Sequence, residues 1–191
     1  LILPTAGTVR VLAAGGALPR RTGCTPAAHQ DIGGEDQASS HEQWLDTARQ
    51  GAQARRTVGF VFTDPSAQLV MPTALEDIAL SLRRTHSKKP DRLAAAHEAL
   101  AEFGLGHLAD RSVHTLSGGQ KQLLAIAAVL ATRPRILVAD EPTTLLDLRN
   151  GLRIRELLLK LPQQVIVVTH DLELAAQADR TLVVENARVV F

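Results

Sequence analysis

Two adjacent carboxylates follow a hydrophobic run in the second half of the chain and have the chemistry of a reactive site. The run extends from Ile136 to Ala139, and Asp140 and Glu141 come directly after it. Such a run is typical of a buried parallel strand, and α/β proteins place ligands at the carboxyl ends of their strands. An aspartate there can hold Mg²⁺, and a glutamate can orient and deprotonate an attacking water. Taken alone, the pair slightly favours a solvated strand end over a reactive site.

A histidine follows a second hydrophobic run. The apolar residues Val165 to Val168 are followed by Thr169 and His170. If this strand runs beside the one that ends at Asp140, the histidine lies at the same edge of the sheet. A lone histidine is more often structural than catalytic. This position favours a hydrogen bond from His170 to a phosphate oxygen or to the attacking water.

A serine, two glycines and a glutamine form the third candidate. Ser117, Gly118, Gly119 and Gln120 have capping-box spacing, which predicts a helix that begins here. Each glycine costs the helix about 1 kcal/mol relative to alanine, which makes sense if a ligand must approach the backbone closely. Free N–H groups at a helix start attract an anion such as phosphate. Without other motifs, simple helix capping is the plainer interpretation.

The elements that position these residues alternate along the chain. Helical periodicity covers residues 93–103, with Gly104 as a stop, and residues 154–161, ended by Pro162. Short runs rich in valine and isoleucine predict parallel strands buried on both faces, at 58–62, 136–139, 165–168 and 182–184. The predicted fold class is α/β, with a mostly parallel sheet flanked by helices.

Composition narrows the possible functions. The chain has 191 residues, 45% of them hydrophobic, which suits one α/β domain of ordinary size. A formal net charge of +1 gives no reason to expect a nucleic-acid partner. The single cysteine, Cys24, excludes an internal disulfide and fits a reducing compartment. The longest apolar run, 123–131, is far shorter than the roughly 20 residues of a membrane-spanning helix. We therefore expect any membrane association to run through a partner.

Two segments near the start do not fit the alternating pattern. The first 12 residues are typical of a turn and then a strand, so we expect a chain cut before or within a domain. Residues 13–43 are rich in small and polar residues without periodicity. They predict a disordered insertion, or a stretch translated in the wrong frame.

Together, and in this order, the motifs resemble the ABC ATPase family. Residues 116–120 match its signature sequence, and 136–141 match its Walker B strand with the catalytic glutamate. His170 matches its switch histidine, and 144–147 look like the D-loop that crosses the dimer interface. The resemblance covers 57–191, and residues 4–12 resemble the stretch that follows the family's nucleotide-binding helix.

The resemblance implies an ATP hydrolase coupled to transport, with a P-loop NTPase-like fold and a helical subdomain at 75–114. The chain 1–191 would be one partial domain that lacks its N-terminal strands. Asp140 would bind Mg²⁺, and Glu141 and His170 would be catalytic. ATP would be held by the P-loop of one subunit and by residues 117–120 of the other, with Thr63 and Asp147 close to it.

The sequence departs from the family pattern in two places. No Gly-x-x-x-x-Gly-Lys-Ser/Thr occurs in it. The family's P-loop cradles the phosphates, so the resemblance implies that it lies upstream of Leu1 and that this chain as given binds ATP poorly and is inactive. The second departure is Thr63, which stands where the family has the Q-loop glutamine. Its hydroxyl can still reach Mg²⁺ directly or through water, whereas the nearby Gln68 is a weaker substitute.

Residues 64–77 are similar to ATPases of the energy-coupling-factor and cobalt type, and most of all to those of bacterial biotin uptake. The resemblance implies an importer of a vitamin, with biotin as the guess, or of a metal ion. Its partners would be a second ATPase subunit, a transmembrane coupling subunit and a substrate-binding membrane subunit. The ATPase would lie at the cytoplasmic face of the membrane.

Two alternatives remain open. A non-transport member of the superfamily, such as a repair ATPase or a translation factor, would carry a long coiled coil or a second cassette. The sequence contains neither sustained heptads nor a second set of motifs. The other alternative is a non-catalytic remnant, which the missing P-loop favours and the intact Asp140, Glu141 and His170 oppose.

Overall fold

The computed structural model describes residues 10–12, 44–46, 49–186 and 188–190. It forms two compact units, Leu1–Thr57 and Val58–Phe191, which are described separately. The predicted insertion at 13–43 lies outside the described residues. No helix in the described part of the chain has the length and apolar character needed to cross a membrane.

The described residues of the first unit form two short strands and one helix. Strand β1 (Arg10–Leu12) pairs antiparallel with β2 (Trp44–Asp46), and helix α1 (Gly51–Thr57) follows. Gln50 joins the second strand to the helix, because its backbone N–H donates to the Asp46 carbonyl at 2.7 Å.

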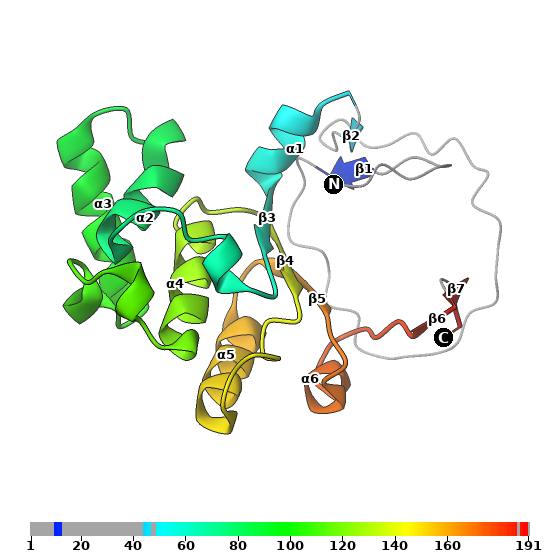
Figure 1. Ribbon diagram of the computed structural model, residues 1–191. Helices are drawn as coiled ribbons and strands as arrows, with labels where there is room; N and C mark the ends of the chain where they lie inside the picture. Colours follow the sequence, from blue (N-terminus) through cyan, green and yellow to red (C-terminus); the bar gives the residue numbers. More distant parts are fainter. Residues whose placement is uncertain (1–9, 13–43, 47–48, 187, 191) are drawn as a thin grey trace. The chain divides into compact units, whose positions relative to one another are not determined.

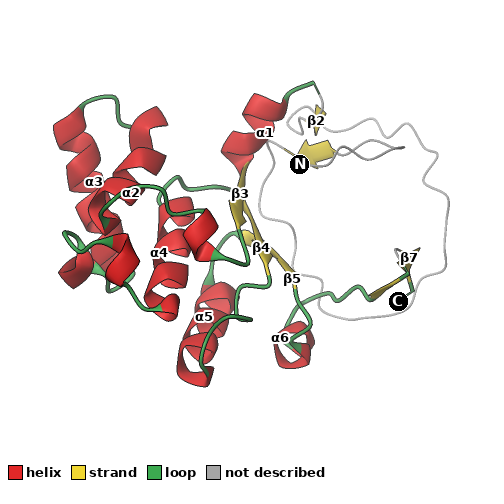
Figure 2. Ribbon diagram, viewed as in Figure 1, coloured by secondary structure: helices red, strands yellow, loops and turns green. Residues whose placement is uncertain are grey.

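The second unit is built on a parallel sheet of three strands. They are β3 (Val58–Val61), β4 (Ile136–Asp140) and β5 (Gln164–Val168), in the order β3-β4-β5. Both strand pairs are parallel, and the register aligns Phe60 with Val138 and Val138 with Ile166. The sheet lies beside helices of the same unit (Figures 1 and 2). The predicted α/β fold with a parallel sheet is confirmed.

The two faces of this sheet differ in burial. One face is covered by α4 (Gly118–Leu130) and α5 (Leu148–Lys160), and Leu137 on that face is 0% exposed. On the other face Phe60 and Ile166 are 44% and 46% exposed. The prediction of strands buried on both faces is therefore wrong for this sheet, because the described helices of the unit pack on one face only.

A hairpin near the end of the chain replaces one predicted parallel strand. Strands β6 (Val184–Glu185) and β7 (Arg188–Val189) pair antiparallel. Asn186 follows the first of them with φ of 48°, a backbone conformation that asparagine tolerates and that tight hairpin turns need. The apolar run at 182–184 is also exposed, so the prediction of a buried parallel strand there is wrong.

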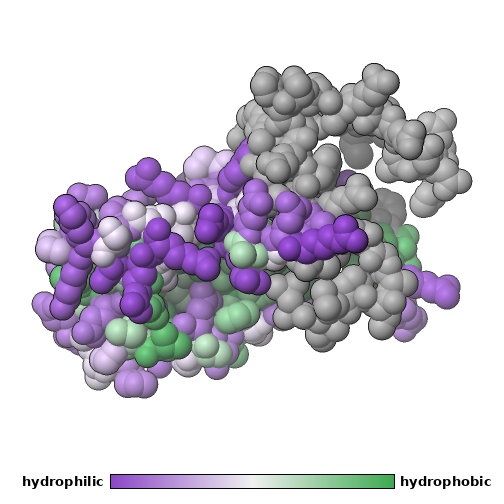
Figure 3. All heavy atoms as spheres, turned by 90° about the horizontal axis from the view of Figure 1, so that it is seen from above, coloured by the Kyte–Doolittle hydropathy of each residue, from purple (hydrophilic) through white to green (hydrophobic). Residues whose placement is uncertain are grey.

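Helices and turns occupy the chain between β3 and β4. Helices α2 (Ala74–Ser81) and α3 (Lys89–Glu102) pack against each other and against α4. Four 3₁₀ helices complete the segment: η1 (Pro65–Ala67), η2 (Leu82–Arg84), η3 (Gly106–Leu108) and η4 (Val113–Thr115). Figure 3 shows hydrophilic side chains over much of the visible face of the described residues. That 75–114 forms a subdomain of its own stays a prediction.

The predicted helix signals at Gly104 and Ser117 are confirmed. Gly104 has φ of 69°, and its N–H donates to the Ala101 carbonyl at 3.0 Å. The N–H of Leu105 donates to the Leu100 carbonyl at 2.7 Å, which completes a Schellman motif at the end of α3. Ser117 caps α4. These signals delimit the helices that carry the candidate site.

Candidate functional site

Thr63 and Asp140 meet at the carboxyl edge of the sheet. Asp140 is the last residue of β4, and Thr63 lies two residues beyond the end of β3. The Thr63 hydroxyl donates to Asp140 Oδ2 at 3.1 Å, and both side chains are partly buried. The neighbouring parallel strands bring them together, as the register requires.

Glu141 lies at the same edge and is held by four donors. Its Oε2 accepts hydrogen bonds from the hydroxyls of Thr144 at 2.8 Å and Thr169 at 3.3 Å. Its Oε1 accepts from the backbone N–H of His170 at 3.1 Å and lies 2.9 Å from His170 Nδ1. The backbone N–H of Glu141 donates to the Val168 carbonyl at 2.8 Å. Asp140, Glu141 and His170 thus converge at one edge, as predicted from the sequence.

The Glu141–His170 contact shifts the pKa of both groups. Partial burial of the Glu141 carboxylate acts to raise its pKa, but hydrogen bonds from His170, Thr144 and Thr169 bring the pKa below the ordinary 4.5. The hydrogen bond to Glu141, reinforced by the carboxylate charge, raises the pKa of His170 above the ordinary 6.5. Both shifts favour the ion pair.

The oxygen atoms at this edge are suitable ligands for Mg²⁺. Asp140 supplies a carboxylate and Thr63 a hydroxyl, and hard cations prefer oxygen ligands. Within the described ranges no three His, Cys, Asp or Glu side chains form a cluster that could hold a metal by themselves. Mg²⁺ commonly completes its octahedron with water and substrate phosphates, so one carboxylate and one hydroxyl suffice for an ion that arrives with a nucleotide.

The amide of Gln68 is used elsewhere. Its Oε1 accepts from the N–H of Phe62 at 3.1 Å, and its Nε2 donates to the carbonyl of Phe60 at 3.3 Å. The side chain thereby extends β3 and braces the following loop. Thr63 is therefore the polar side chain of this loop that contacts Asp140.

The start of α4 is capped and faces solvent. The N–H of Gln120 donates to Ser117 Oγ at 3.3 Å, and the N–H of Ser117 donates to Gln120 Oε1 at 2.9 Å. Ser117 and Gly118 are exposed. The nearest atom to a Cβ added at Gly118 is the Leu145 carbonyl oxygen at 3.7 Å, so this position has room for a side chain.

Gly119 has a different environment from Gly118. A Cβ added there would overlap the side chain of Asn150 in α5. The sequence interpretation assigned both glycines to the approach of a ligand. For Gly119 the structure supplies an internal reason, which is the close packing of α4 on α5.

Asp147, predicted to lie close to the nucleotide, caps α5. Its Oδ1 accepts from the N–H of Asn150 at 2.9 Å, and its Oδ2 accepts from Asn150 Nδ2 at 2.7 Å. These two hydrogen bonds lower the pKa of Asp147 below its ordinary value. Asp147 thereby orients Asn150 against Gly119 and connects the starts of the two helices.

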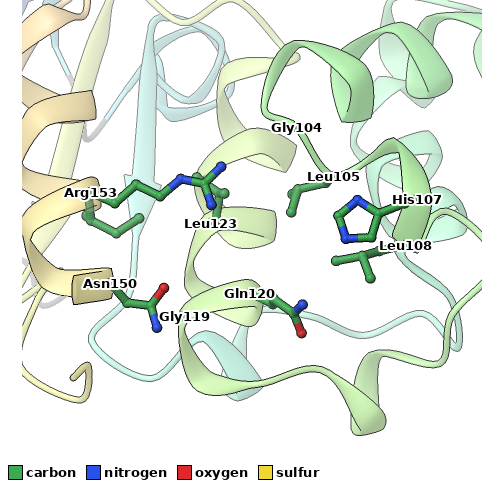
Figure 4. A pocket seen from close by; sticks show the side chains of 10 residues that line it. Gly104, Leu105, His107, Leu108, Gly119, Gln120, Leu123, Asn150 and Arg153 are labelled. Carbon is green, nitrogen blue, oxygen red and sulfur yellow. The ribbon is translucent and has the colours of Figure 1, made fainter. Parts of the chain in front are cut away.

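A cavity of about 140 Å³ lies beside this connection (Figure 4). Arg153 and Asn150 line it from α5, Gln120 from α4 and His107 from η3. Its deeper wall includes Leu123 and other apolar side chains. None of the groups around Glu141 lines this cavity.

Sequence analysis did not predict the contacts that three side chains make near this edge. The hydroxyls of Thr144 and Thr169 contact Glu141, and their positions next to the motif residues were the available signal. Arg155 of α5 was also missed. Its guanidinium lies 2.7 Å from Asp171 Oδ2 and 2.6 Å from Glu173 Oε2. No local pattern identifies its partners, which are 16 and 18 residues away.

Comparison with known proteins assigns the chain to one family. The profile of the ABC transporter family matches residues 25–144, which is more than half of the chain. A putative ABC transporter ATP-binding protein of Bartonella quintana is 43% identical over 147 residues, which are 77% of this chain and 65% of that protein. The chain therefore spans just under two thirds of this relative.

Two further relatives carry more specific names. The biotin transport ATP-binding protein BioM of Rhizobium etli is 45% identical over 69% of this chain and 59% of its own length. The energy-coupling factor transporter ATP-binding protein EcfA1 of Levilactobacillus brevis is 37% identical over 72% of this chain and 51% of its own.

Two similar solved structures also come from ABC proteins. CbiO1 of Clostridium perfringens, part of the ABC transporter complex CbiONQ, has a TM-score of 0.68 and 30% identity over 80% of this chain and 65% of that one. The ATP-binding cassette MJ0796, a dimer bound to ADP and Pi after hydrolysis, has a TM-score of 0.66 and 33% identity over 77% of this chain and 68% of that one.

Proposed function

The chain belongs to the ABC transporter family, and from this we propose that it is part of the ATP-hydrolysing subunit of an ABC importer. The observation that carries the proposal is the convergence of Asp140, Glu141 and His170 at the carboxyl edge of one parallel sheet. Phosphoryl transfer depends mainly on positioning and electrostatics, so a site of a few well-held polar groups is sufficient.

Asp140 and Thr63 hold Mg²⁺ in this proposal. The Thr63 hydroxyl already donates to Asp140 Oδ2, which keeps the hydroxyl oxygen and the carboxylate oxygen 3.1 Å apart at the edge of the sheet. When bound with ATP, Mg²⁺ neutralises part of the phosphate charge. Thr63 stands where the family has a glutamine, and its shorter side chain would offer a hydroxyl oxygen to Mg²⁺ directly or through a water molecule.

Glu141 acts as the general base in this proposal. In the structure both of its carboxylate oxygens are occupied by donors from Thr144, Thr169 and His170. A base must have a free lone pair to take a proton from water. We therefore interpret the observed arrangement as a resting state. Release of the His170 imidazole would free one lone pair of Glu141 Oε1, which keeps its hydrogen bond from the His170 backbone N–H, and the imidazole would then be able to donate to a γ-phosphate oxygen.

A second subunit completes the site in this proposal. The start of α4 faces solvent, and the N–H groups of Gly118 and Gly119 suit a phosphate brought by another molecule. The dimeric form of MJ0796 bound to ADP and Pi supports such an arrangement. Asp147 would then help to orient the same helix start toward the nucleotide.

The transported substrate is proposed to be a vitamin or a metal ion. Support comes from the names of two relatives, BioM for biotin and EcfA1 for energy-coupling factor transport, and from the CbiONQ complex that contains CbiO1. We propose a second ATPase subunit, a transmembrane coupling subunit and a substrate-binding membrane subunit as partners. The ATPase would then bind peripherally at the cytoplasmic face of the membrane.

The substitution Glu141→Gln tests the assignment of the base. In a form of the protein that includes a P-loop, we expect the variant to bind ATP normally and to lose turnover by at least a hundredfold, because an amide cannot take the proton. Glu156→Gln is the matched control, since Glu156 lies on the outer side of α5 and pairs only with Lys160 at 3.5 Å. Unchanged phosphate release from the Glu141 variant would refute the assignment.

A nucleotide-binding assay distinguishes a working ATPase from a non-catalytic remnant. Residues 1–191 contain no P-loop sequence, so we expect them to bind ATP weakly. A form that also includes a P-loop should bind ATP at micromolar concentrations and hydrolyse it. If both forms bind ATP equally weakly, the result would favour the hypothesis that the protein is a non-catalytic remnant.

A further inference from the structure

Arg155 holds the loop after β5 through two carboxylates. Its Nη2 donates to Asp171 at 2.7 Å and its Nη1 to Glu173 at 2.6 Å. The Arg155 side chain is 15% exposed, the Asp171 side chain 20% and the Glu173 side chain 78%. Charge-assisted hydrogen bonds are shorter and stronger than neutral ones, and partial burial reduces their screening by solvent. The pair with Asp171 is therefore the stronger of the two.

Asp171 fixes the loop on both of its sides. Its Oδ1 accepts from the N–H groups of Glu173 at 3.0 Å and Leu174 at 3.1 Å, and so caps helix α6 (Leu172–Ala176). Its own N–H donates to Thr169 Oγ1 at 3.0 Å. Asp171 therefore sets the position of Thr169 as well as the start of the helix.

A continuous series of hydrogen bonds thus runs from α5 to the proposed general base. Arg155 holds Asp171, the Asp171 N–H holds the Thr169 hydroxyl, and this hydroxyl donates to Glu141 at 3.3 Å. His170, between Thr169 and Asp171, contacts the other oxygen of the same carboxylate. We propose that Arg155 is a positioning residue for ATP hydrolysis, which acts through Asp171 to fix Thr169 and His170 against Glu141. This inference rests on the proposed function.

Stability alone does not explain an arginine at this position. Helix α5 is anchored by Ile154 and Leu158, which are 1% and 3% exposed. The Nε of Arg155 is buried and has no hydrogen-bond partner, and an unsatisfied buried N–H destabilises a fold. Hydrophobic residues that replace a whole buried ion pair often leave stability unchanged or raise it, so packing of α5 does not by itself require a charged pair here. The arginine is therefore better explained by what it holds.

The experiment compares Arg155→Met, Arg155→Gln and Arg155→Lys in a form of the protein that includes a P-loop. We expect kcat to fall about tenfold in the first two variants with KM for ATP within about twofold, because a small misplacement of the base slows chemistry without weakening binding. Arg155→Lys keeps the charge and should recover most of the loss. Lys160→Gln, on the same helix and 77% exposed, is the matched control.

Measurements below the unfolding midpoint separate positioning from folding. Both Arg155→Met and Arg155→Gln leave Asp171 without its partner, so each should lower the thermal unfolding midpoint to a similar extent, and turnover measured well below that midpoint should be equally slow in both. In the nucleotide-free protein, amide hydrogen exchange should accelerate in residues 169–174 and stay unchanged in α4. A wild-type kcat in Arg155→Met, or unchanged exchange in this loop, overturns the proposal. So does a loss of kcat that accompanies accelerated exchange throughout the unit.

Asp171 and Glu173, the two carboxylates that Arg155 contacts, allow a second test. Asp171→Asn should slow turnover more than Glu173→Gln, because the Glu173 side chain is mostly exposed. The double variant Arg155→Gln/Asp171→Asn should be no slower than Asp171→Asn alone, since both act through one contact. Additive losses would overturn the route through Asp171. If the wild-type protein fails to hydrolyse ATP, or Glu141→Gln stays active, the proposed function fails instead.

Discussion

Glu141 and His170 form an ion pair at the carboxyl edge of the sheet. The two side chains approach to 2.9 Å, although the histidine side chain is 76% exposed. Solvent therefore screens the charge pair, and its contribution to stability is small. In the proposed mechanism the contact matters more, because it occupies the Glu141 oxygen that the attacking water must reach.

The pH dependence of stability tests this pair in the variant His170→Gln. Because the pKa of His170 is raised above 6.5, its contribution is complete below pH 6.5 and is lost as the pH rises through the raised value. Because the pKa of Glu141 is lowered below 4.5, its contribution is present above pH 4.5 and is lost as the pH falls through the lowered value. The free energy of unfolding should therefore differ most between wild type and His170→Gln from pH 4.5 to pH 6.5.

Urea denaturation at low ionic strength, repeated across the pH range, measures this difference in the free energy of unfolding. His86→Gln is a suitable control, because His86 is partly exposed and its ring contacts the neighbouring Thr85 hydroxyl rather than a carboxylate. A difference between wild type and His170→Gln that does not change with pH would contradict the ion pair.

Among the secondary-structure elements, the first turns of α4 and α5 are packed together and hold each other in place. Ser117 caps the first helix and Asp147 caps the second. Asn150, held by Asp147, fills the space in front of Gly119. The helix start proposed to contact the nucleotide is thus held by the helix that carries Arg155.

We expect Gly119→Ala to destabilise the protein by about 1–3 kcal/mol, because its methyl group overlaps Asn150 and overpacking exceeds the gain in helix propensity. Gly118→Ala, in the same turn but with open space, should be neutral or stabilising. Urea denaturation of both variants gives the comparison. Combining Gly119→Ala with Asn150→Ala should recover part of the loss, and a stabilising Gly119→Ala would contradict the packing argument.

At the scale of the whole molecule, the unit Val58–Phe191 has a sheet with one covered and one exposed face. Leu137 and Ile166 belong to neighbouring strands and differ in exposure, at 0% and 46%. The hydrophobic core lies between the sheet and the helices α2 to α5. Stability therefore depends on one face of the sheet far more than on the other.

Threonine substitutions on the two faces test this asymmetry. Leu137→Thr should lower the free energy of unfolding of residues 1–191 by about 3 kcal/mol, because it removes packed atoms and buries a hydroxyl. Ile166→Thr should cost less than about 1 kcal/mol and should reduce the binding of a hydrophobic dye. Equal losses from the two variants would show that the second face is also covered in solution.

Much of the fold and of the site followed from local sequence. Hydrophobic runs predicted β3, β4 and β5, and Gly104 and Ser117 predicted two helix boundaries that capping chemistry determines locally. The edge that gathers Asp140, Glu141 and His170 was predictable because adjacent parallel strands end together. These predictions needed no knowledge of distant contacts.

The features that the sequence did not predict depend on tertiary contacts. The run at 182–184 has the composition of a buried strand, but the turn at Asn186 and its partner strand decide its direction. The environment of Gly119 is set by Asn150, and the partners of Arg155 lie on another element. Both faces of strands β3, β4 and β5 are apolar, so their hydrophobicity does not tell which face is covered.

The backbone of Glu141 has a practical consequence for anyone who selects variants by heat resistance. Its φ of 46° is a conformation that glycine adopts freely and that costs other residues roughly 1–2 kcal/mol. Among substitutions that remove the carboxylate, glycine should thus outlast alanine on heating. Among heat-resistant variants that lack this carboxylate, glycine should therefore be found more often than alanine, and durability needs to be scored separately from turnover.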